Sequence, residues 1–431
     1  MRFRARWLWT LLAMGVAVAA VACAGGGEEG TPAGRPAGWR QVKTDFGVTD
    51  TEIKLGHTNV LSGNLAAVYA PVTPSMDAYF KKVNQEDGGV CGRQIRLIVE
   101  DHQYNPSRAL EAVTKLIVQD QVAALVGDLG TPSVTGEVDY VNQQRVPHLF
   151  VSTGASKWGD YQRWPWTTGF IPDYVSEGRI LARYINDNAQ RIFNKPVGQV
   201  RVAMLYQNDD FGKDGANGFK QDFRGQIATE QTYESTATDI TSQLINMRAA
   251  NPDFVYLYST PAFTAQAFRY MKANNWRPPV LMSYVNPPFS VAQGVGGGNV
   301  EAGYRDIAGT ILTTYILDVV ADRDQPPMRE HVRIMQQYGG PPIQPLSAYG
   351  QSLAELVVET LKRACERGDM TREGILRAAE SIRGFRMSLL LPGIEVNLGP
   401  QDHFAIQALM PAEVQQDGSV RYLLNEAISL E

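Results

Sequence analysis

Apolar and polar positions alternate along the chain with two different periods from about residue 52 onward. Residues 53–60 read as a strand, and a helical face then repeats every three or four residues at Met76, Tyr79, Phe80 and Val83. Residues 122–126 and 148–151 are short and wholly apolar, which is typical of parallel strands covered by helices on both faces. The pattern predicts that residues 50–160 form a doubly wound α/β lobe.

The same alternation begins again after the aromatic stretch 164–170. Helices alternate here with predicted strands at 200–206, 254–258 and 280–283. The proline- and glycine-rich residues 286–299 interrupt the pattern before a further strand at 310–314 and a long helix at 347–366. The whole chain is therefore predicted to be an α/β protein with two doubly wound, Rossmann-like lobes.

The first residues have the features of an export signal. Three arginines precede an uncharged apolar stretch, residues 7–22, which is shorter than the roughly 20 residues that span a bilayer. Small residues lead directly to Cys23, so the segment resembles a bacterial lipobox, and cleavage before an acylated Cys23 is expected; a plain signal peptide is the alternative. The predicted signal is residues 1–22, and the glycine-rich residues 23–49 form a predicted flexible tether. We expect an extracytoplasmic protein that is anchored to the membrane by lipid.

Composition and motifs exclude several classes of function. The net charge is −5 and charged residues make up 20%, so no basic surface is available for nucleic acid. The chain contains no zinc, phosphate-loop or nucleophile-elbow motif, and its five histidines are far apart in sequence. The glycines of 294–298 neither follow a strand nor begin a helix, and they favour a loop over a dinucleotide site. We therefore predict no enzymatic activity, no catalytic residue, no metal and no cofactor.

The cysteine count leaves one question open. The chain has three cysteines. If Cys23 carries lipid, the other two, Cys91 and Cys365, are exposed to an oxidising compartment. They form either one disulfide or two buried thiols.

Small polar residues follow the predicted strands at the places where open α/β sheets bind ligands. Glycines and hydroxyl residues let backbone N–H groups approach an anion, and the helices that follow add partial positive charge. Five such turns occur, three in the first lobe and two in the second, at 61–64, 127–132, 152–156, 208–212 and 258–261. Each alone fits an ordinary turn, but together they favour a cleft for a carboxylate or another strongly polar head group.

Several of these segments resemble one family. Residues 47–56, 61–63, 88–93, 150–158 and 206–213 are similar, in that order, to the branched-chain amino-acid type of ABC-transporter substrate-binding protein. The similarity runs over about residues 45–431. It implies a type I periplasmic-binding fold, monomeric, whose partners are a small-molecule ligand and the permease and ATPase subunits of an importer.

The resemblance also implies a division of the chain. Three hinge crossings are expected near 165–172, 284–288 and 384–394. The first lobe would then take residues 50–167 and 287–385, and the second lobe 168–286 and 386–431. Cys91 and Cys365 would share the first lobe.

Ligand contacts are implied residue by residue. In leucine-binding relatives the ligand carboxylate is held by turns that match Gly130, Thr131 and 152–155, while Tyr69 and Phe211 match side-chain contacts. The predicted binding residues are Ser62, Tyr69, Gly130, Thr131, Ser152, Thr153, Gly154, Ala155, Phe211 and Thr260.

One position departs from the family pattern. The amino-acid binders that this chain resembles have a Pro-Glu pair at the position of Pro261 and Ala262, and their glutamate pairs with the ligand ammonium. This chain has Ala262 in place of that glutamate. A buried unpaired ammonium is costly, so the sequence favours an aromatic or short-chain acid over an α-amino acid unless Asp209 or Asp210 replaces the glutamate. A branched-chain amino-acid binder and a ligand-sensing ectodomain remain the alternatives.

Overall fold

The computed structural model describes residues 38–430, which contain two large β-sheets and one small two-stranded sheet. The predicted signal, the tether up to residue 37 and Cys23 lie outside the described residues. No helix of the described part is long and apolar enough to cross a membrane.

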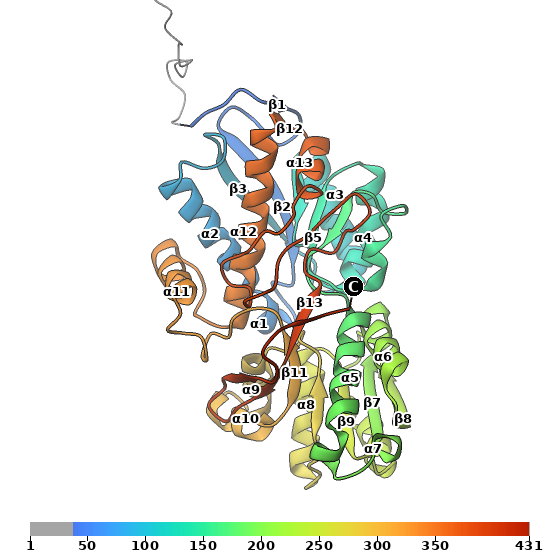
Figure 1. Cartoon of the computed structure of the whole chain (residues 1–431). Coiled ribbons are helices and arrows are strands. Elements are labelled where there is room, and N and C mark those ends of the chain that lie inside the picture. The colour runs from blue at the N-terminus through green and yellow to red at the C-terminus, as the bar shows by residue number, and fades with distance from the viewer. Residues whose placement is uncertain (1–37, 431) are drawn as a thin grey trace, which may run out of the picture. The chain divides into compact units, whose positions relative to one another are not determined.

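The first sheet has five parallel strands in the order β3-β2-β4-β5-β6. The strands are β2 (Glu52–Asn59), β3 (Gln94–Asp101), β4 (Ala124–Val126), β5 (His148–Val151) and β6 (Thr167–Gly169). Its helices are α1 (Ala66–Tyr69), α2 (Val72–Glu86), α3 (Pro106–Val118), α4 (Thr131–Gln143), α11 (Pro326–Tyr338), α12 (Pro345–Glu366) and α13 (Arg372–Ala379). The late helix α12 lies beside the early helix α2 (Figure 1).

Both faces of this sheet are buried, as the apolar strands predicted. Along β4, Ala124 and Val126 belong to the main core, whereas Leu125 packs with α3 and α4 in a separate cluster. Successive residues of a strand point to opposite faces, so a strand covered on both sides must be apolar throughout. Helix α3 begins as predicted: Asn105 accepts hydrogen bonds from the backbone of Ser107 and Arg108, and Pro106 occupies the first turn.

The second sheet has eight strands in the order β14-β13-β11-β10-β9-β7-β8, with β15 paired to β13. The strands are β7 (Arg201–Gln207), β8 (Gln226–Tyr233), β9 (Phe254–Tyr258), β10 (Val280–Met282), β11 (Ile311–Thr314), β13 (Ala408–Val414), β14 (Val420–Tyr422) and β15 (Ile428–Ser429). Its helices are α5 (Tyr174–Phe193), α6 (Asp210–Asp222), α7 (Thr241–Ala249), α8 (Pro261–Ala273), α9 (Pro288–Val295) and α10 (Val300–Ile307). The segment from β7 to β11 pairs in parallel, and the C-terminal strands add antiparallel edges.

The chain passes between the elements of the two sheets three times: between β6 and α5, between β11 and α11, and between α13 and β13. The boundary predicted at residue 287 is too early, because β11 pairs with β10 and so belongs to the second sheet. The proline- and glycine-rich stretch near this boundary forms the short helix α9 and the turn before α10. The predicted tether extends too far, to residue 49, because Lys43 and Thr44 form a strand that pairs with Asp369 and Met370. The other boundaries of the predicted lobes remain predictions.

Cys91 and Cys365 form a disulfide between the turn before β3 and the last turn of α12. Nearby, β1 (Lys43–Thr44) pairs in parallel with β12 (Asp369–Met370). The bridge therefore joins two segments of the first lobe that are 274 residues apart in sequence.

Because the closed loop is so long, we expect reduction of this disulfide to lower the free energy of unfolding by as much as ~5 kcal/mol. Denaturant unfolding with and without reductant measures the change, and mass mapping without reductant should give one linked peptide. The double variant Cys91→Ser/Cys365→Ser is the control and should not respond to reductant. Two freely alkylated thiols in the untreated protein would contradict the pairing.

Candidate functional site

A cavity lies where the loops that follow the strands of the two sheets meet. Its volume is about 140 Å³. The first lobe contributes residues 129–131 after β4 and Ser152 after β5, and the second contributes Phe211 of α6 and Thr260 before α8. This is the edge of an open α/β sheet at which ligands bind.

Hydroxyl groups gather around the start of α4. The hydroxyls of Thr131 and Thr153 are 2.7 Å apart. Tyr349 donates its hydroxyl hydrogen to Ser152 over 2.6 Å, which leaves the hydrogen of Ser152 available to a ligand. Burial raises the pKa of Tyr174 to about 12, while hydrogen bonds from Gly154, Thr153 and Thr131 lower it, so this phenol belongs to the same group. We call Thr131, Ser152, Thr153, Tyr174 and Tyr349 the hydroxyl cluster.

The start of α4 adds a partial positive charge to the hydroxyl cluster. Gly130 caps this helix of 13 residues with a φ of 98°, a backbone conformation that favours glycine. A Cβ at this position would come within 2.5 Å of the ring of Tyr104, so glycine also lets that ring pack against the turn. The N-terminal N–H groups of a helix attract negative charge, and this end of the cavity therefore suits an anion.

Most of the remaining cavity wall is apolar or aromatic; its other polar residues are Thr260, Thr313, Thr314 and Asp318. Tyr174 and Phe211 meet edge to face with ring centroids 5.0 Å apart. The other apolar and aromatic lining residues are Tyr69, Val72, Tyr104, Leu129, Ile171, Tyr284, Val285, Pro287, Pro288, Leu312, Tyr315, Ile316, Leu317, Pro345, Leu346 and Val420. Such a wall accommodates the hydrocarbon part of a ligand.

Few charged groups reach the cavity. Its lining, all within residues 38–430, contains no lysine, arginine or histidine and has one carboxylate, that of Asp318. Burial raises the pKa of Asp318, whereas backbone hydrogen bonds, including those from Ala321 and Val320 at 2.7 and 3.0 Å, lower it. An anionic ligand would thus be held by neutral donors rather than by a cationic side chain.

A buried carboxylate supports the wall from behind. Glu177 of α5 accepts hydrogen bonds from the hydroxyls of Tyr258, Ser283 and Thr313 at 2.6, 2.7 and 2.7 Å. It also accepts one from the backbone N–H of Tyr284 at 2.7 Å. Burial raises the pKa of Glu177 to about 7, and these donors oppose the rise. Because Tyr284 and Thr313 line the cavity, Glu177 fixes this part of its wall.

Polar contacts join the two sides next to the cavity. Lys157 pairs with Asp210 at 2.5 Å, and the backbone N–H of Ser156 donates to Asp214 at 2.7 Å. In addition, Gln207 Nε2 lies 3.4 Å from the hydroxyl of Tyr104, a lining residue. These contacts stabilise the arrangement in which both lobes enclose the cavity.

The structure brings together six of the ten predicted binding residues. Those that line the cavity are Tyr69, Gly130, Thr131, Ser152, Phe211 and Thr260. Their contacts with a ligand remain predictions.

Four predicted residues lie outside the lining. Ser62 donates to Asp101 and accepts from Gln103, so its hydroxyl serves a turn. The Thr153 hydroxyl is fully buried and bonds to that of Thr131. Gly154 has the carbonyl of Pro172 within 2.3 Å of where a Cβ would stand, and Ala155 is fully buried.

The acidic residues proposed as replacements at the Ala262 position also lie outside the lining. Ala262 itself is exposed. Asp210 is engaged by Lys157, and Asp209 accepts from Gln207 Nε2 at 2.6 Å and caps α6. Burial raises the pKa of Asp209.

Sequence reasoning missed much of the wall. The crossing between β11 and α11 supplies Tyr315 and Asp318, and the start of α12 supplies Tyr349. These positions belong to no polar turn after a predicted strand. An aromatic residue within an apolar run gave no signal that separates a cavity wall from an ordinary core.

Comparison with solved structures places this architecture among known binding proteins. A fatty acid ABC transporter substrate-binding protein from Thermomonospora curvata has a TM-score of 0.75 at 21% identity, covering 90% of this chain and 95% of its own. A branched chain amino acid ABC transporter protein from Thermus thermophilus with bound valine has a TM-score of 0.76 at 18% identity, covering 88% and 97%. A leucine binding protein from Thermotoga maritima has a TM-score of 0.69 at 19% identity, covering 88% and 99%.

Sequence comparison gives the family. No curated protein sequence matches the chain significantly. The family model described as periplasmic binding protein matches residues 52–419, which is most of the chain. The family and the two-lobed type I fold predicted from the sequence are thereby confirmed: the chain belongs to the periplasmic binding protein family.

Proposed function

We propose that this protein is the extracytoplasmic solute-binding component of an ABC importer and that it captures a carboxylic acid without an α-amino group. The observation that carries the proposal is the cavity, in which hydroxyl groups and a helix N-terminus face a mostly apolar and aromatic space. The ligand class is an acid with an aromatic or short aliphatic body. The protein binds its ligand and does not transform it.

The hydroxyl cluster supports a carboxylate. Ser152 can donate to the ligand because it already accepts from Tyr349, and Thr131 lies at the first turn of α4. Neutral donors and a helix dipole stabilise an anion without a cationic partner when the space around them excludes water. The fatty-acid name of the Thermomonospora curvata neighbour agrees with an acid that carries no ammonium.

A second ligand class rests on one residue. Asp318 lines the cavity, and its carboxylate could pair with the ammonium of an amino acid, in keeping with the valine bound by the Thermus thermophilus neighbour. The three backbone groups that already donate to Asp318 weigh against this role. Asp209 and Asp210, which are engaged elsewhere and do not line the cavity, support it even less.

Hinge closure is the proposed mechanism. The ligand would contact Thr131 and Ser152 from one lobe and Phe211 and Thr260 from the other, so it stabilises the closed arrangement only when all of them engage it. The closed form would then dock on a permease. A sensing role, in which occupancy is passed to a signalling partner, is the alternative, and genes for a permease and an ATPase beside this one would favour transport.

We expect carboxylic acids such as phenylacetate and 4-methylpentanoate to raise the melting temperature, and leucine, isoleucine and valine to raise it weakly or not at all. Ligand at a hundred times its dissociation constant stabilises the protein by ~2.7 kcal/mol, which a thermal-shift screen detects. The variant Asp318→Asn serves to separate the two ligand classes. Acid binding should survive this substitution, whereas strong leucine binding that Asp318→Asn abolishes would establish the amino-acid class instead.

Thr131→Val and Ser152→Ala should each weaken the acid by ~1–3 kcal/mol, because each removes a hydroxyl that can donate to the carboxylate. Calorimetric titration of the acid that gives the largest thermal shift measures the change in affinity. Thr360→Val is the matched control, since Thr360 is buried in α12 and bonds only to the carbonyl of Leu356. Equal affinities for all three variants and the unaltered protein would rule out the hydroxyl cluster as the carboxylate site.

The anchor is tested at Cys23. We expect Cys23→Ser to abolish incorporation of labelled palmitate in the native host and to release the protein from membranes, because no acylated cysteine then remains. Labelling and membrane fractionation of both proteins provide the measurement. An unaltered protein that is unlabelled and soluble at maturity would refute the lipid anchor.

A further inference from the structure

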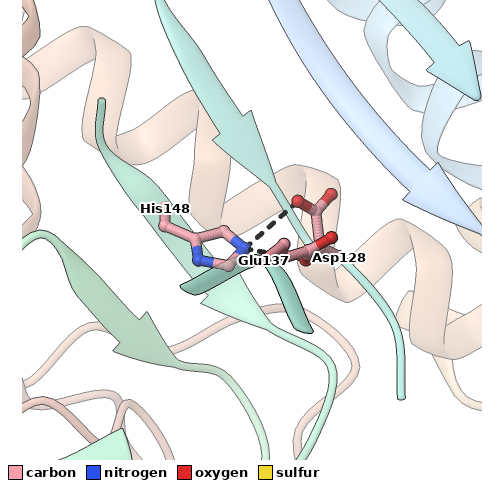
Figure 2. A group of neighbouring side chains, drawn as sticks. All are labelled: Asp128, Glu137 and His148. Atoms are coloured by element: carbon pink, nitrogen blue, oxygen red, sulfur yellow. Dashed lines mark hydrogen bonds and ion pairs between the residues drawn. The ribbon is translucent and has the colours of Figure 1, made fainter. Parts of the chain in front are cut away.

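Three ionisable side chains meet inside the first lobe, away from the cavity lining. Asp128 follows β4, Glu137 lies in α4 and His148 begins β5, and all three are fully buried. His148 Nε2 is 3.1 Å from an oxygen of Asp128 and 3.4 Å from one of Glu137. Figure 2 shows the imidazole edge directed toward both carboxylates. One ligand atom from each residue lies within 4.8 Å of the other two.

The hydrogen bonds within this group are incomplete. Apart from the long 3.4 Å contact with His148 Nε2, neither carboxylate oxygen of Glu137 has a hydrogen-bond partner among the described residues. Asp128 accepts the backbone N–H of Thr58 at 2.8 Å with its other oxygen. A single Nε2–H can serve one carboxylate well, and the geometry assigns it to Asp128. A fully buried carboxylate without a partner is expensive, so the observed contacts alone do not account for Glu137.

We propose that Asp128, Glu137 and His148 form a binding site for one divalent transition-metal cation such as Zn²⁺. Carboxylate oxygens and imidazole nitrogens are both ligands that zinc accepts, and a dication balances the two buried negative charges while the histidine is neutral. The cation would take the place of the Nε2 proton and would give Glu137 the partner that it lacks.

The other nitrogen of His148 is compatible with this role. Nδ1 lies 3.4 Å from the hydroxyl of Thr167, which also accepts from Asn142 at 2.8 Å. A metal-bound imidazole donates its second N–H to an oxygen of this kind, which fixes the tautomer and the ring orientation. Thr167 and Asn142 are therefore positioned to orient the ligand histidine.

A proton is the competing occupant. Burial opposes the charged form of His148, but the hydrogen bond to Asp128 and the negative charges of Asp128 and Glu137 outweigh it and raise the pKa of His148 to about 9. The metal-free group would thus be an imidazolium between two carboxyl groups. That state still leaves Glu137 without a well-aligned donor.

The proposed site would brace the anion-binding turn. The carbonyl of Asp128 accepts the backbone N–H of Ser152 at 2.8 Å, and Asp128 precedes the turn that leads into α4. A cation held by β4, α4 and β5 would therefore fix the three elements that position Thr131 and Ser152. The inference is independent of the proposed ligand, because the metal is detected without it.

The test is metal analysis of the full chain purified from cells grown with added zinc and then desalted. We expect about one equivalent of zinc per unaltered chain and less than about one tenth for Glu137→Gln, which keeps the side-chain shape but removes the carboxylate ligand. Glu355→Gln is the matched control, since Glu355 is an acidic residue of α12 that accepts from Ser388, and it should retain the metal.

A second measurement does not depend on the variants folding. Removing metal from the unaltered protein with a chelator should lower its melting temperature by at least about 3 °C, and added Zn²⁺ should restore it. An unaltered protein that holds less than about one tenth of an equivalent and shows no metal-dependent melting would overturn the proposal in favour of the protonated group. Retention of a full equivalent by Glu137→Gln would also overturn it.

Discussion

Parallel strand pairing is the constraint on which the rest of this structure depends. Parallel neighbours bring their carboxyl ends to one edge of a sheet, so turns that are far apart in sequence become neighbours in space. In the first sheet this places the turn after β4 beside the turn after β5, where Gly130 donates its N–H to the carbonyl of Ser152 at 3.3 Å. The same rule brings the start of α6 and the start of α8 to the opposing edge. The polar end of the cavity follows from strand order more than from any one residue.

The hydrogen bonds that hold the apolar part of the cavity wall in place lie on the side of the wall away from the cavity. Glu177 provides this support, because its four donors come from β9, β11 and the turn after β10 and none is left for the ligand. Burying a carboxylate is costly, and only a full set of hydrogen bonds offsets that cost. Glu137 differs: both residues are buried glutamates of helices, but Glu177 has four hydrogen-bond donors, whereas Glu137 has among the described residues only the long 3.4 Å contact with His148. A complete set of hydrogen-bond donors accounts for Glu177 as a structural carboxylate. The incomplete set at Glu137 is the reason for proposing a bound cation there.

Much of the fold could be predicted from the sequence because apolar periodicity is a local property. The wholly apolar strands, the Asn105 cap and the turns after β4 and β5 all lie where the pattern placed them. The boundary at residue 287, which the family resemblance implied, was wrong because local sequence does not say which sheet the next strand joins. Pairing of β10 with β11 is a property of three-dimensional structure and leaves no local signal.

The site was less predictable for physical reasons. A charged residue in an amphipathic helix is normally assigned to the exposed face, so Glu137 and Glu177 gave no sign of being buried. Likewise, Tyr174, Tyr284 and Tyr349 come from separate segments, and only the fold brings their rings to one cavity. Sequence reasoning therefore found the polar turns at one end of the cavity, together with Tyr69 and Phe211, and missed most of the remaining wall.

The central claim is that the cavity holds a carboxylate at its hydroxyl cluster. The most direct measurement is a crystal structure of the protein with the acid that binds most tightly. The account predicts carboxylate oxygens within roughly 2.6–3.2 Å of the hydroxyls of Thr131 and Ser152, with the hydrocarbon body against Phe211 and Tyr284. A carboxylate bound away from the start of α4, with the apolar end of the ligand against these hydroxyls, would contradict it.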